Sequence, residues 1–281
     1  MSIGPRSLVA HVRGILQAKP LYPIGHFYSP VPSAADGRRA AEWLELEPAG
    51  IDLRRDAQAA LVGELGPRWS ELDRDGRWAP SDQLSLSDAA VYASVLRHRR
   101  PARVLEVGSG YTTAVALDTI QHHALPTELV CIEPFADRLR GLLREGDVVE
   151  LHEVPVQDAD TSLFARLAAG DVLFIDSTHV AKAGSDLVWL LLHVLPRLAP
   201  GVLVHFHDIF WPMEYPREWL EQNRGWNEIY FLHAFLMGNP SWQIELFNDY
   251  VWSQMPEVVD RWLPEARDER PGSLWVSPCA R

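Results

Sequence analysis

The sequence predicts an α/β fold: a doubly wound sheet of about seven strands, mostly parallel with the last strand antiparallel, behind a helical N-terminal extension. Three observations support this prediction. From residue 103 onward, short apolar runs alternate with longer helical patterns, as in a parallel sheet with helices on both faces. The first apolar run passes through Gly108 and Gly110 straight into a helix. Five apolar runs end in acids, amides or histidines, where strands of such a sheet meet a ligand.

The chain before this pattern is expected to form an N-terminal helical region, 1–84, ahead of the main domain, 85–281. Ser7–Ala18 is predicted to be a helix because its apolar residues fall on one side. Pro20–Pro32 is rich in proline but too apolar for a solvated linker, so it is either a strap over the core or a lid over the site. Asp56–Leu72 is the second predicted helix of this region.

The main domain begins with a predicted helix, Ser85–His98, whose N-cap is Ser85 or Ser87. The strand Val104–Val107 and the helix Thr112–Ile120 follow. The remaining predicted strands are Glu128–Glu133, Val149–Val156, Asp171–Asp176, Val202–His207 and a closing antiparallel pair, Trp242–Asn248 and Ser273–Val276. The remaining predicted helices are Ala136–Leu143, Ser162–Ala168, Asp186–Leu198, Arg217–Asn223 and Asn227–Met237.

Charge and composition narrow the function. Twenty-six basic residues against 38 acidic ones give a net charge of −12, which argues against nucleic acid as the main substrate. Cys131 and Cys279 are the two cysteines, so neither a disulfide framework nor a cysteine-rich metal site follows. The N-terminus lacks a signal-peptide pattern, and the longest apolar run, Leu187–Leu195, is too short to span a membrane. We therefore expect a soluble, cytoplasmic protein without a membrane or nucleic-acid partner.

The turn after the first predicted strand has the features of a nucleotide-binding loop. Gly108 and Gly110 allow a ligand to approach the backbone closely, and Glu106 lies at the strand end. A second acid, Glu133, ends the next strand about 25 residues later, where such folds bind ribose hydroxyls. Thr113 stands where a dinucleotide fingerprint has its third glycine. The pattern therefore indicates a cofactor that contains ribose but no pyrophosphate.

These residues resemble the class I S-adenosylmethionine (SAM)-dependent methyltransferases, through Glu106-x-Gly108-x-Gly110 and Glu133. The resemblance implies a Rossmann-like sheet of seven strands and SAM as the cofactor, and Gln157 and Asp158 stand where the adenine amino group would bind. Asp158 as a plain turn residue is an alternative. The implied cofactor-binding residues are Glu106, Gly108, Ser109, Gly110, Glu133, Gln157, Asp158 and Asp176.

The ends of the fourth and fifth predicted strands resemble a second group, the metal-dependent O-methyltransferases. The resemblance implies a divalent metal held by Asp176, His207 and Asp208. His207 departs from the oxygen ligand usual in that group, and a histidine shifts the preference from magnesium toward manganese, iron or zinc. Alternatively, Asp176 and Asp208 cap loops and hydrogen-bond the cofactor or the substrate.

A histidine is the expected catalytic base, because imidazole titrates near neutral pH. In the same relatives a lysine or histidine three residues after the acid takes the acceptor's proton, which makes His179 the first candidate. His205 is the second, since it shares a strand face with His207. A hydrogen-bonded structural histidine is the alternative for each.

The resemblance extends over nearly the whole chain to a bacterial group of class I methyltransferases of unassigned substrate, through Phe27–Ser33, Phe174–Val180 and His205–Phe210. It implies methyl transfer from SAM to a hydroxyl oxygen of a small molecule such as a sugar or secondary metabolite. Two alternatives stay open: a SAM-binding protein of this fold without transfer activity, and a nicotinamide-dependent oxidoreductase. Thr113 argues against the oxidoreductase, because it stands where a dinucleotide fingerprint has its third glycine. The N-terminal region is either a lid or a subunit interface, and the latter would give a homo-oligomer.

Overall fold

The computed structural model describes residues 20–79, 81 and 83–280, and the expected helix Ser7–Ala18 lies outside them. The chain divides into two compact units. One contains the described residues up to Trp43 together with Pro216–Gly225, and the other contains Leu44–Tyr215 and the chain from Trp226 onward. In this division the described residues between 44 and 84 fall in the unit that contains the sheet, and the expected domain boundary at residue 84 stays a prediction.

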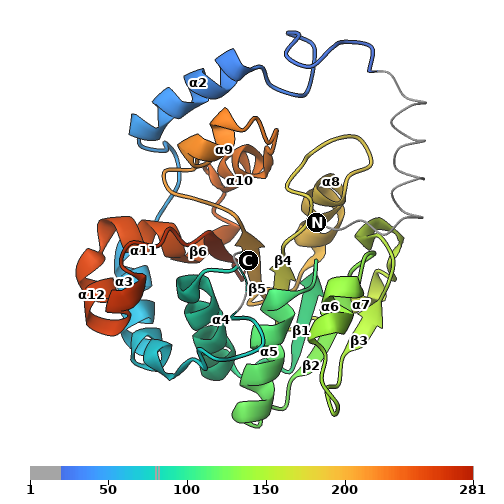
Figure 1. Ribbon diagram of the computed structural model, residues 1–281, viewed down its shortest axis with the longest axis vertical. Helices are drawn as coiled ribbons and strands as arrows, with labels where there is room; N and C mark the ends of the chain where they lie inside the picture. The colour runs from blue at the N-terminus through green and yellow to red at the C-terminus, as the bar shows by residue number, and fades with distance from the viewer. Residues whose placement is uncertain (1–19, 80, 82, 281) are drawn as a thin grey trace. The chain divides into compact units, whose positions relative to one another are not determined.

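The second unit contains a seven-stranded sheet with the order β3-β2-β1-β4-β5-β7-β6 (Figure 1). Neighbours from β3 to β5 are parallel, whereas β7 runs antiparallel to both β5 and β6. This confirms the predicted fold class. The strands are β1 Arg103–Val107, β2 Glu128–Ile132, β3 Glu150–His152, β4 Val172–Ile175, β5 Leu203–His207, β6 Trp242–Phe247 and β7 Ser273–Pro278.

Helices connect and flank these strands, and α4 and α5 lie side by side (Figure 1). The α-helices of this unit are α3 Arg55–Leu65, α4 Leu86–Arg99, α5 Tyr111–His122, α6 Asp137–Leu142, α7 Ser162–Ala165, α8 Asp186–Trp189, α10 Glu228–Leu236, α11 Asn248–Gln254 and α12 Pro256–Trp262. Short 3₁₀ segments occupy Trp43–Glu45, Gly66–Glu71, Val156–Asp158, Leu195–Arg197 and Pro264–Ala266, and a π-helical turn occupies Leu190–Val194.

Two expected helices are shorter than the sequence pattern suggests, and a proline accounts for each. The α-helical part of Asp56–Leu72 ends at Leu65, just before Pro67, and continues as a 3₁₀ turn. The helix expected over Asp186–Leu198 changes to π and then 3₁₀ geometry toward Pro196. Proline lacks the N–H that an α-helix needs and clashes with the carbonyl four residues earlier, so the ladder cannot continue unchanged. The expected N-cap of α4 is confirmed, since the Ser85 hydroxyl accepts a hydrogen bond from the Asp88 N–H at 3.0 Å.

The register of the central strands brings the predicted polar residues to one edge of the sheet. Val107 pairs with Ile132 on β2 and with Ile175 on β4. The residues that follow these three strands therefore emerge together. Because β1 is also the strand where the chain order reverses, this edge is the crevice in which open α/β sheets bind ligands.

The core lies on both faces of the sheet. Every residue of β4 and β5 is buried, and consecutive side chains of a strand point to opposite faces, so neither face of these strands is open to solvent. Phe174, Phe206 and Trp275 are among the largest fully buried side chains. The central strands are thus rigid supports for the loops at their carboxyl ends.

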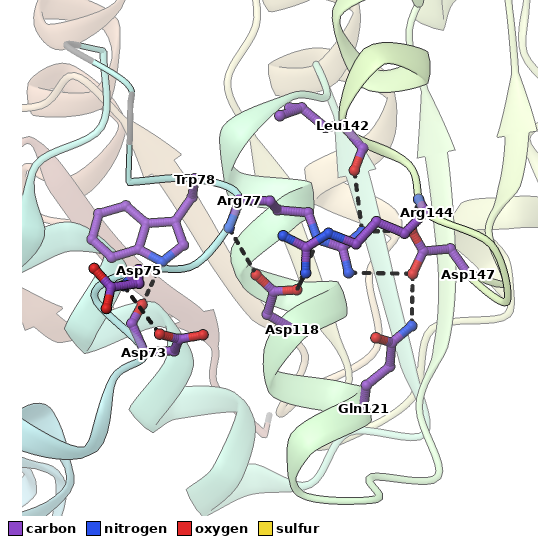
Figure 2. A network of polar contacts seen from close by, with 9 residues as sticks. All are labelled: Asp73, Asp75, Arg77, Trp78, Asp118, Gln121, Leu142, Arg144 and Asp147. Atoms are coloured by element: carbon purple, nitrogen blue, oxygen red, sulfur yellow. Dashed lines mark hydrogen bonds and ion pairs between the residues drawn. The ribbon is translucent and has the colours of Figure 1, made fainter.

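A buried arginine joins the chain before α4 to the helices of the sheet (Figure 2). The Arg77 Nε donates to Asp118 on α5 at 2.7 Å, and its guanidinium also contacts Asp147 in the loop after α6 and the carbonyl of Leu142. Gln121 donates to Asp147 at 2.6 Å. The Arg77 side chain is 4% exposed and that of Asp147 is 2% exposed, so the two charges depend on each other.

The first unit contains α2 Ala34–Glu42 and α9 Arg217–Glu221, which pack against each other. Ser33 caps α2 through a capping box with Asp36. Gly37 permits the close approach of the two helices, because a Cβ there would lie 2.7 Å from the Leu220 carbonyl oxygen. The proline-rich segment before α2 carries stacked rings, among them Tyr22 and His26 at 4.8 Å between centroids. Whether this segment is a strap or a lid stays a prediction.

Among the residues that the structure describes, no helix combines the length and apolar character needed to cross a bilayer.

We expect Arg77→Met to lower the free energy of unfolding by about 3 kcal/mol or more, because it leaves the Asp147 carboxylate buried and unpaired. The matched control is Arg140→Met, whose ion pair with Glu153 is about half exposed and should be worth less than about 1 kcal/mol. Urea unfolding of the two variants measures both values. Equal losses of unfolding free energy in the two variants would show that the buried network of Arg77 does not stabilise the chain segment before α4.

Candidate functional site

The predicted cofactor turn touches the end of β4 through its backbone. Gly108 has a φ of +83°, and a Cβ at this position would lie 1.8 Å from the carbonyl oxygen of Asp176. The Asp176 N–H donates to the carbonyl of Val107 at 2.9 Å. Glycine is therefore required at 108 both for its backbone conformation and for space. The turn after β1 and the loop after β4 form one continuous surface.

Thr113 has a structural role in the turn. Its hydroxyl accepts a hydrogen bond from the Gly110 N–H at 3.0 Å and donates one to the Glu106 carboxylate. This caps the start of α5 from inside the protein. The residue that replaces the third glycine of a dinucleotide fingerprint thus fixes the turn.

Glu106 lies in the core beneath the turn with no exposed surface. Its carboxylate accepts hydrogen bonds from Tyr92 at 3.0 Å and from Thr113, and the Cys131 thiol lies 3.8 Å away. Burial raises the pKa of Glu106 to about 7, although the bonds from Thr113 and Tyr92 oppose the shift. The structure therefore places this predicted cofactor residue where its hydrogen bonds hold α4, β1 and α5 together.

Glu133, directly after β2, faces the cofactor turn. Its carboxylate accepts from the backbone N–H of Ser109 at 3.2 Å and from that of Phe135 at 2.7 Å. A carboxylate has about four acceptor sites, so Glu133 keeps capacity for further donors. The Ser109 hydroxyl is buried and has no hydrogen-bond partner among the described residues.

Gln157 and Asp158 lie in the short 3₁₀ turn after β3. The Gln157 amide donates to the carbonyl of Gly184 at 2.9 Å, which ties this turn to the loop before α8. Asp158 is exposed, and its N–H closes the turn on Pro155 at 2.9 Å. Their roles in adenine binding stay predictions.

Three ionisable side chains gather next to the turn, and we call them the acidic cluster: Asp176, His179 and Asp208. The His179 Nε2 lies 3.3 Å from Asp176 Oδ1 and 3.6 Å from Asp208 Oδ2. One ligand atom from each of the three residues falls within 4.8 Å of the other two. The cluster therefore presents two carboxylates and one imidazole to a single point.

Two residues of the cluster adopt left-handed backbone conformations, with φ values of +58° at His179 and +59° at Asp208. Such values are uncommon outside glycine and persist only where the surroundings hold them. The N–H groups of Asn227 and Glu228 both donate to the His179 carbonyl, at 3.0 and 3.2 Å. The Asn227 side chain also receives a hydrogen bond from the Ala181 N–H at 2.6 Å. The start of α10 thus fixes the loop that carries His179.

Burial and neighbouring charges shift the pKa values of the cluster in opposite directions. Burial alone would lower the pKa of His179, but hydrogen bonds to Asp176 and Glu228 and the charge of Asp208 raise it well above its ordinary value. Burial raises the pKa of Asp208 and of Glu228. It acts likewise on Asp176, but the hydrogen bond from His179 leaves that pKa below its ordinary value. Acidic oxygens outnumber cationic groups here, so the cluster favours an added cation.

The cluster contains His179 in the place that the sequence assigns to His207. His207 is 6% exposed, and its ring lies 5.6 Å from that of His205 and 6.3 Å from that of Phe174. His205 lies still deeper, stacked on Phe174 at 3.7 Å with its Nε2 2.9 Å from the Ser273 hydroxyl. Burial and the charge of His207 lower the pKa of His205 well below its ordinary value. Burial alone would lower the pKa of His207, but the charges of Asp208 and Asp176 raise it, so this ring also lies within electrostatic reach of the cluster, and its role as a metal ligand stays a prediction.

Sequence reasoning missed Glu228, which is 1% exposed and places its Oε2 2.8 Å from the His179 Nδ1. The available signal was an acid directly before Ile229 and two positions after Trp226. The Trp226 ring lies 4.3 Å from the His179 ring, centroid to centroid. Tyr215 is buried, and its hydroxyl accepts a hydrogen bond from the Ile229 N–H at 3.3 Å. The Trp211 ring, in the loop after β5, packs edge-on against the Tyr250 ring at 4.8 Å.

Comparison with known proteins gives a family. Residues 105–209 match a family model described as a methyltransferase domain. An uncharacterized protein from Archaeoglobus fulgidus is 31% identical over an alignment of 165 residues that covers 52% of this chain and 74% of that protein. The residues matched by the family model include the turn after β1 and the strand ends that carry the acidic cluster.

Solved structures with a similar arrangement include the methyltransferase PaMTH1 from Podospora anserina bound to S-adenosylhomocysteine (SAH), at 18% identity and a TM-score of 0.47, covering 94% of this chain and all of that one. The plantazolicin methyltransferase BpumL in complex with SAH is 10% identical with a TM-score of 0.48, covering 81% of this chain and 99% of that one. In both cases SAH is the ligand of the solved structure.

We expect Glu106→Gln to change how stability depends on pH. The pKa of Glu106 rises from 4.5 to about 7 on folding, so its contribution to stability is complete below pH 4.5 and is lost as the pH rises through 7. Between pH 5 and pH 8 the wild type should lose about 2 kcal/mol relative to the glutamine variant, which cannot ionise. Denaturant unfolding of both proteins across this range measures the difference. Parallel pH profiles would mean that Glu106 is not held neutral in the fold.

Proposed function

This chain belongs to the class I SAM-dependent methyltransferase family, and on that premise we propose that it transfers the methyl group of SAM to a hydroxyl oxygen of a small molecule, such as a sugar or secondary metabolite. The observation that carries the proposal is the backbone contact between Gly108 and Asp176, because it joins the cofactor turn to the acidic cluster. A methyl donor on the turn and an acceptor at the cluster would therefore be neighbours. Methyl transfer needs such an arrangement, since nucleophile, methyl carbon and sulfur must lie in line.

The cofactor would be held by the turn after β1 and by Glu133. The donor chemistry fits SAM: Glu133 keeps free acceptor capacity for ribose hydroxyls, and the buried Ser109 hydroxyl has no hydrogen-bond partner among the described residues. Gly108 and Gly110 leave the backbone open to a ligand without phosphates. Glu106 would act indirectly, by fixing the turn through Thr113.

The acidic cluster fits a divalent metal, which would be held by Asp176, His179 and Asp208. Two carboxylates and one imidazole around a single point are a donor set suited to manganese, iron or zinc. Such an ion would supply positive charge that lowers the pKa of an acceptor hydroxyl. The chain's own contribution is to place these donors on two rigid strand ends and to exclude water with buried side chains around them.

His179 suits the role of ligand better than that of base. Both of its ring nitrogens face carboxylates, Nδ1 toward Glu228 and Nε2 toward Asp176 and Asp208. A ring in this setting holds protons, whereas a base must present a free nitrogen to the acceptor. Facing a cation, the same Nε2 supplies its lone pair while Nδ1 keeps its proton.

The loop after β5 would form one wall of the acceptor site, and it is held in place from outside the cluster. Asp249 accepts from the Trp211 N–H at 2.8 Å, and Arg270 donates to the Trp211 carbonyl at 2.6 Å. Glu214 accepts from the Tyr230 hydroxyl at 2.7 Å, which fastens the loop to α10. These contacts support a preformed acceptor wall.

We expect the purified protein to bind SAH, and Glu133→Gln to weaken that binding about tenfold or more, because a charge-assisted acceptor is lost. Glu150→Gln is the control, since Glu150 lies on β3 and bonds His152 at the surface. Calorimetric titration of the three proteins measures the affinities. The absence of SAH binding to the wild type would refute the proposed cofactor, and SAH binding without turnover of any hydroxyl acceptor would favour a binding protein.

We expect Mn²⁺ to bind, and His179→Gln or Asp208→Asn to weaken it about tenfold or more, because losing a ligand costs at least as much as losing a residue that supports one. His207→Asn should leave the affinity within a few-fold of the wild type, which separates the ligand set proposed here from the one expected from the sequence. Titration of EDTA-treated protein with Mn²⁺ provides the measurement. A loss confined to His207→Asn would reinstate His207 as the ligand.

A further inference from the structure

Glu228 is a buried acid whose placement needs an explanation. Its side chain lies at the start of α10, far along the sequence from the acidic cluster, and the residue is 1% exposed. Burying a carboxylate costs several kcal/mol unless hydrogen bonds compensate. Within the described part of the chain, its Oε1 has no partner, and its Oε2 contacts the His179 Nδ1 at 2.8 Å. Among the described residues, His179 is therefore the one hydrogen-bond partner of this carboxylate.

The surroundings of His179 hold the ring so that Nε2 points into the cluster. Its Nδ1 side is taken by Glu228, and its face is covered by the Trp226 ring at 4.3 Å and an interplanar angle of 33°. The backbone is fixed as well, because the N–H groups of Asn227 and Glu228 donate to the His179 carbonyl. Three consecutive residues thus set the position, plane and rotation of one imidazole.

We propose that Glu228 is a positioning residue: it keeps the proton of neutral His179 on Nδ1 and thereby directs the Nε2 lone pair at the point shared with Asp176 and Asp208. The inference rests on the proposed metal site and deepens it. A histidine that binds a cation through one nitrogen must carry its proton on the other, and a carboxylate at that nitrogen fixes the tautomer and strengthens the donor. Glu228 adds a third chain segment to a site otherwise built from the ends of β4 and β5.

The test compares two buried glutamates of the same region. Glu228→Leu removes the acceptor at Nδ1, and we expect the Mn²⁺ affinity to fall about 10- to 100-fold while SAH affinity is unchanged. Glu214→Leu is the matched control, because Glu214 is 3% exposed and bonds Tyr230 instead. The Mn²⁺ affinity of Glu228→Gln, whose amide oxygen can still accept a hydrogen bond from Nδ1, should lie between those of Glu228→Leu and the wild type. This variant replaces Glu228→Leu in the test if Glu228→Leu does not fold.

A second measurement separates this inference from the proposed function. Nitrogen-15 spectra of the His179 ring in metal-free protein, at a pH high enough to leave one proton on the ring, should show the Nδ1–H tautomer in the wild type and a mixture in Glu228→Leu. If the wild type binds SAH but no Mn²⁺, the metal site fails and the spectra alone decide the role of Glu228. Wild-type Mn²⁺ affinity in Glu228→Leu, equal losses in Glu214→Leu, or unchanged spectra would overturn the inference.

Discussion

The arrangement of this protein depends on one backbone contact, that of Gly108 with the carbonyl oxygen of Asp176. The contact is possible because β1 and β4 are in register up to their last residues, so that both chains leave the sheet at the same level. It brings a turn suited to a ribose-containing cofactor without phosphates within reach of a cluster of carboxylates. A side chain at 108 would separate the two, and no rearrangement of side chains elsewhere could restore the distance.

Around this contact the fold places several ionisable groups out of water. Beneath the turn, burial raises the pKa of Glu106 to about 7, whereas above the turn neighbouring carboxylates raise the pKa of His179. The two environments differ in one respect: Glu106 is surrounded by hydroxyl donors and apolar strands, and His179 by acids. The environment of Glu106 stabilises the fold and raises the pKa of this acid. The environment of His179 gathers carboxylates at one point of the site.

The sequence predicted β1, β2, β4 and β5 closely, because each is an apolar run that ends abruptly in glycine or a polar residue. It was less informative where tertiary contacts decide. The strand expected over Val149–Val156 is reduced to Glu150–His152, since this edge strand has one neighbour. Glu228 could not be assigned, because its approach to His179 depends on the path of the chain after β5. The proximity of the His179 ring to Asp176 and Asp208 was also not predictable from the sequence, since His179 lies on a loop whose path depends on tertiary contacts.

The chain leaves the sheet-containing unit after Tyr215 and returns to it at Trp226, two positions before Glu228. The segment Pro216–Gly225 belongs with α2 to the other unit. The residues that flank it are held in the sheet-containing unit: the Tyr215 hydroxyl accepts a hydrogen bond from the Ile229 N–H, and the Trp226 ring contacts the His179 ring. The residues that orient His179 therefore lie outside Pro216–Gly225, so a change in the length or sequence of that segment leaves Trp226, Asn227 and Glu228 themselves unaltered.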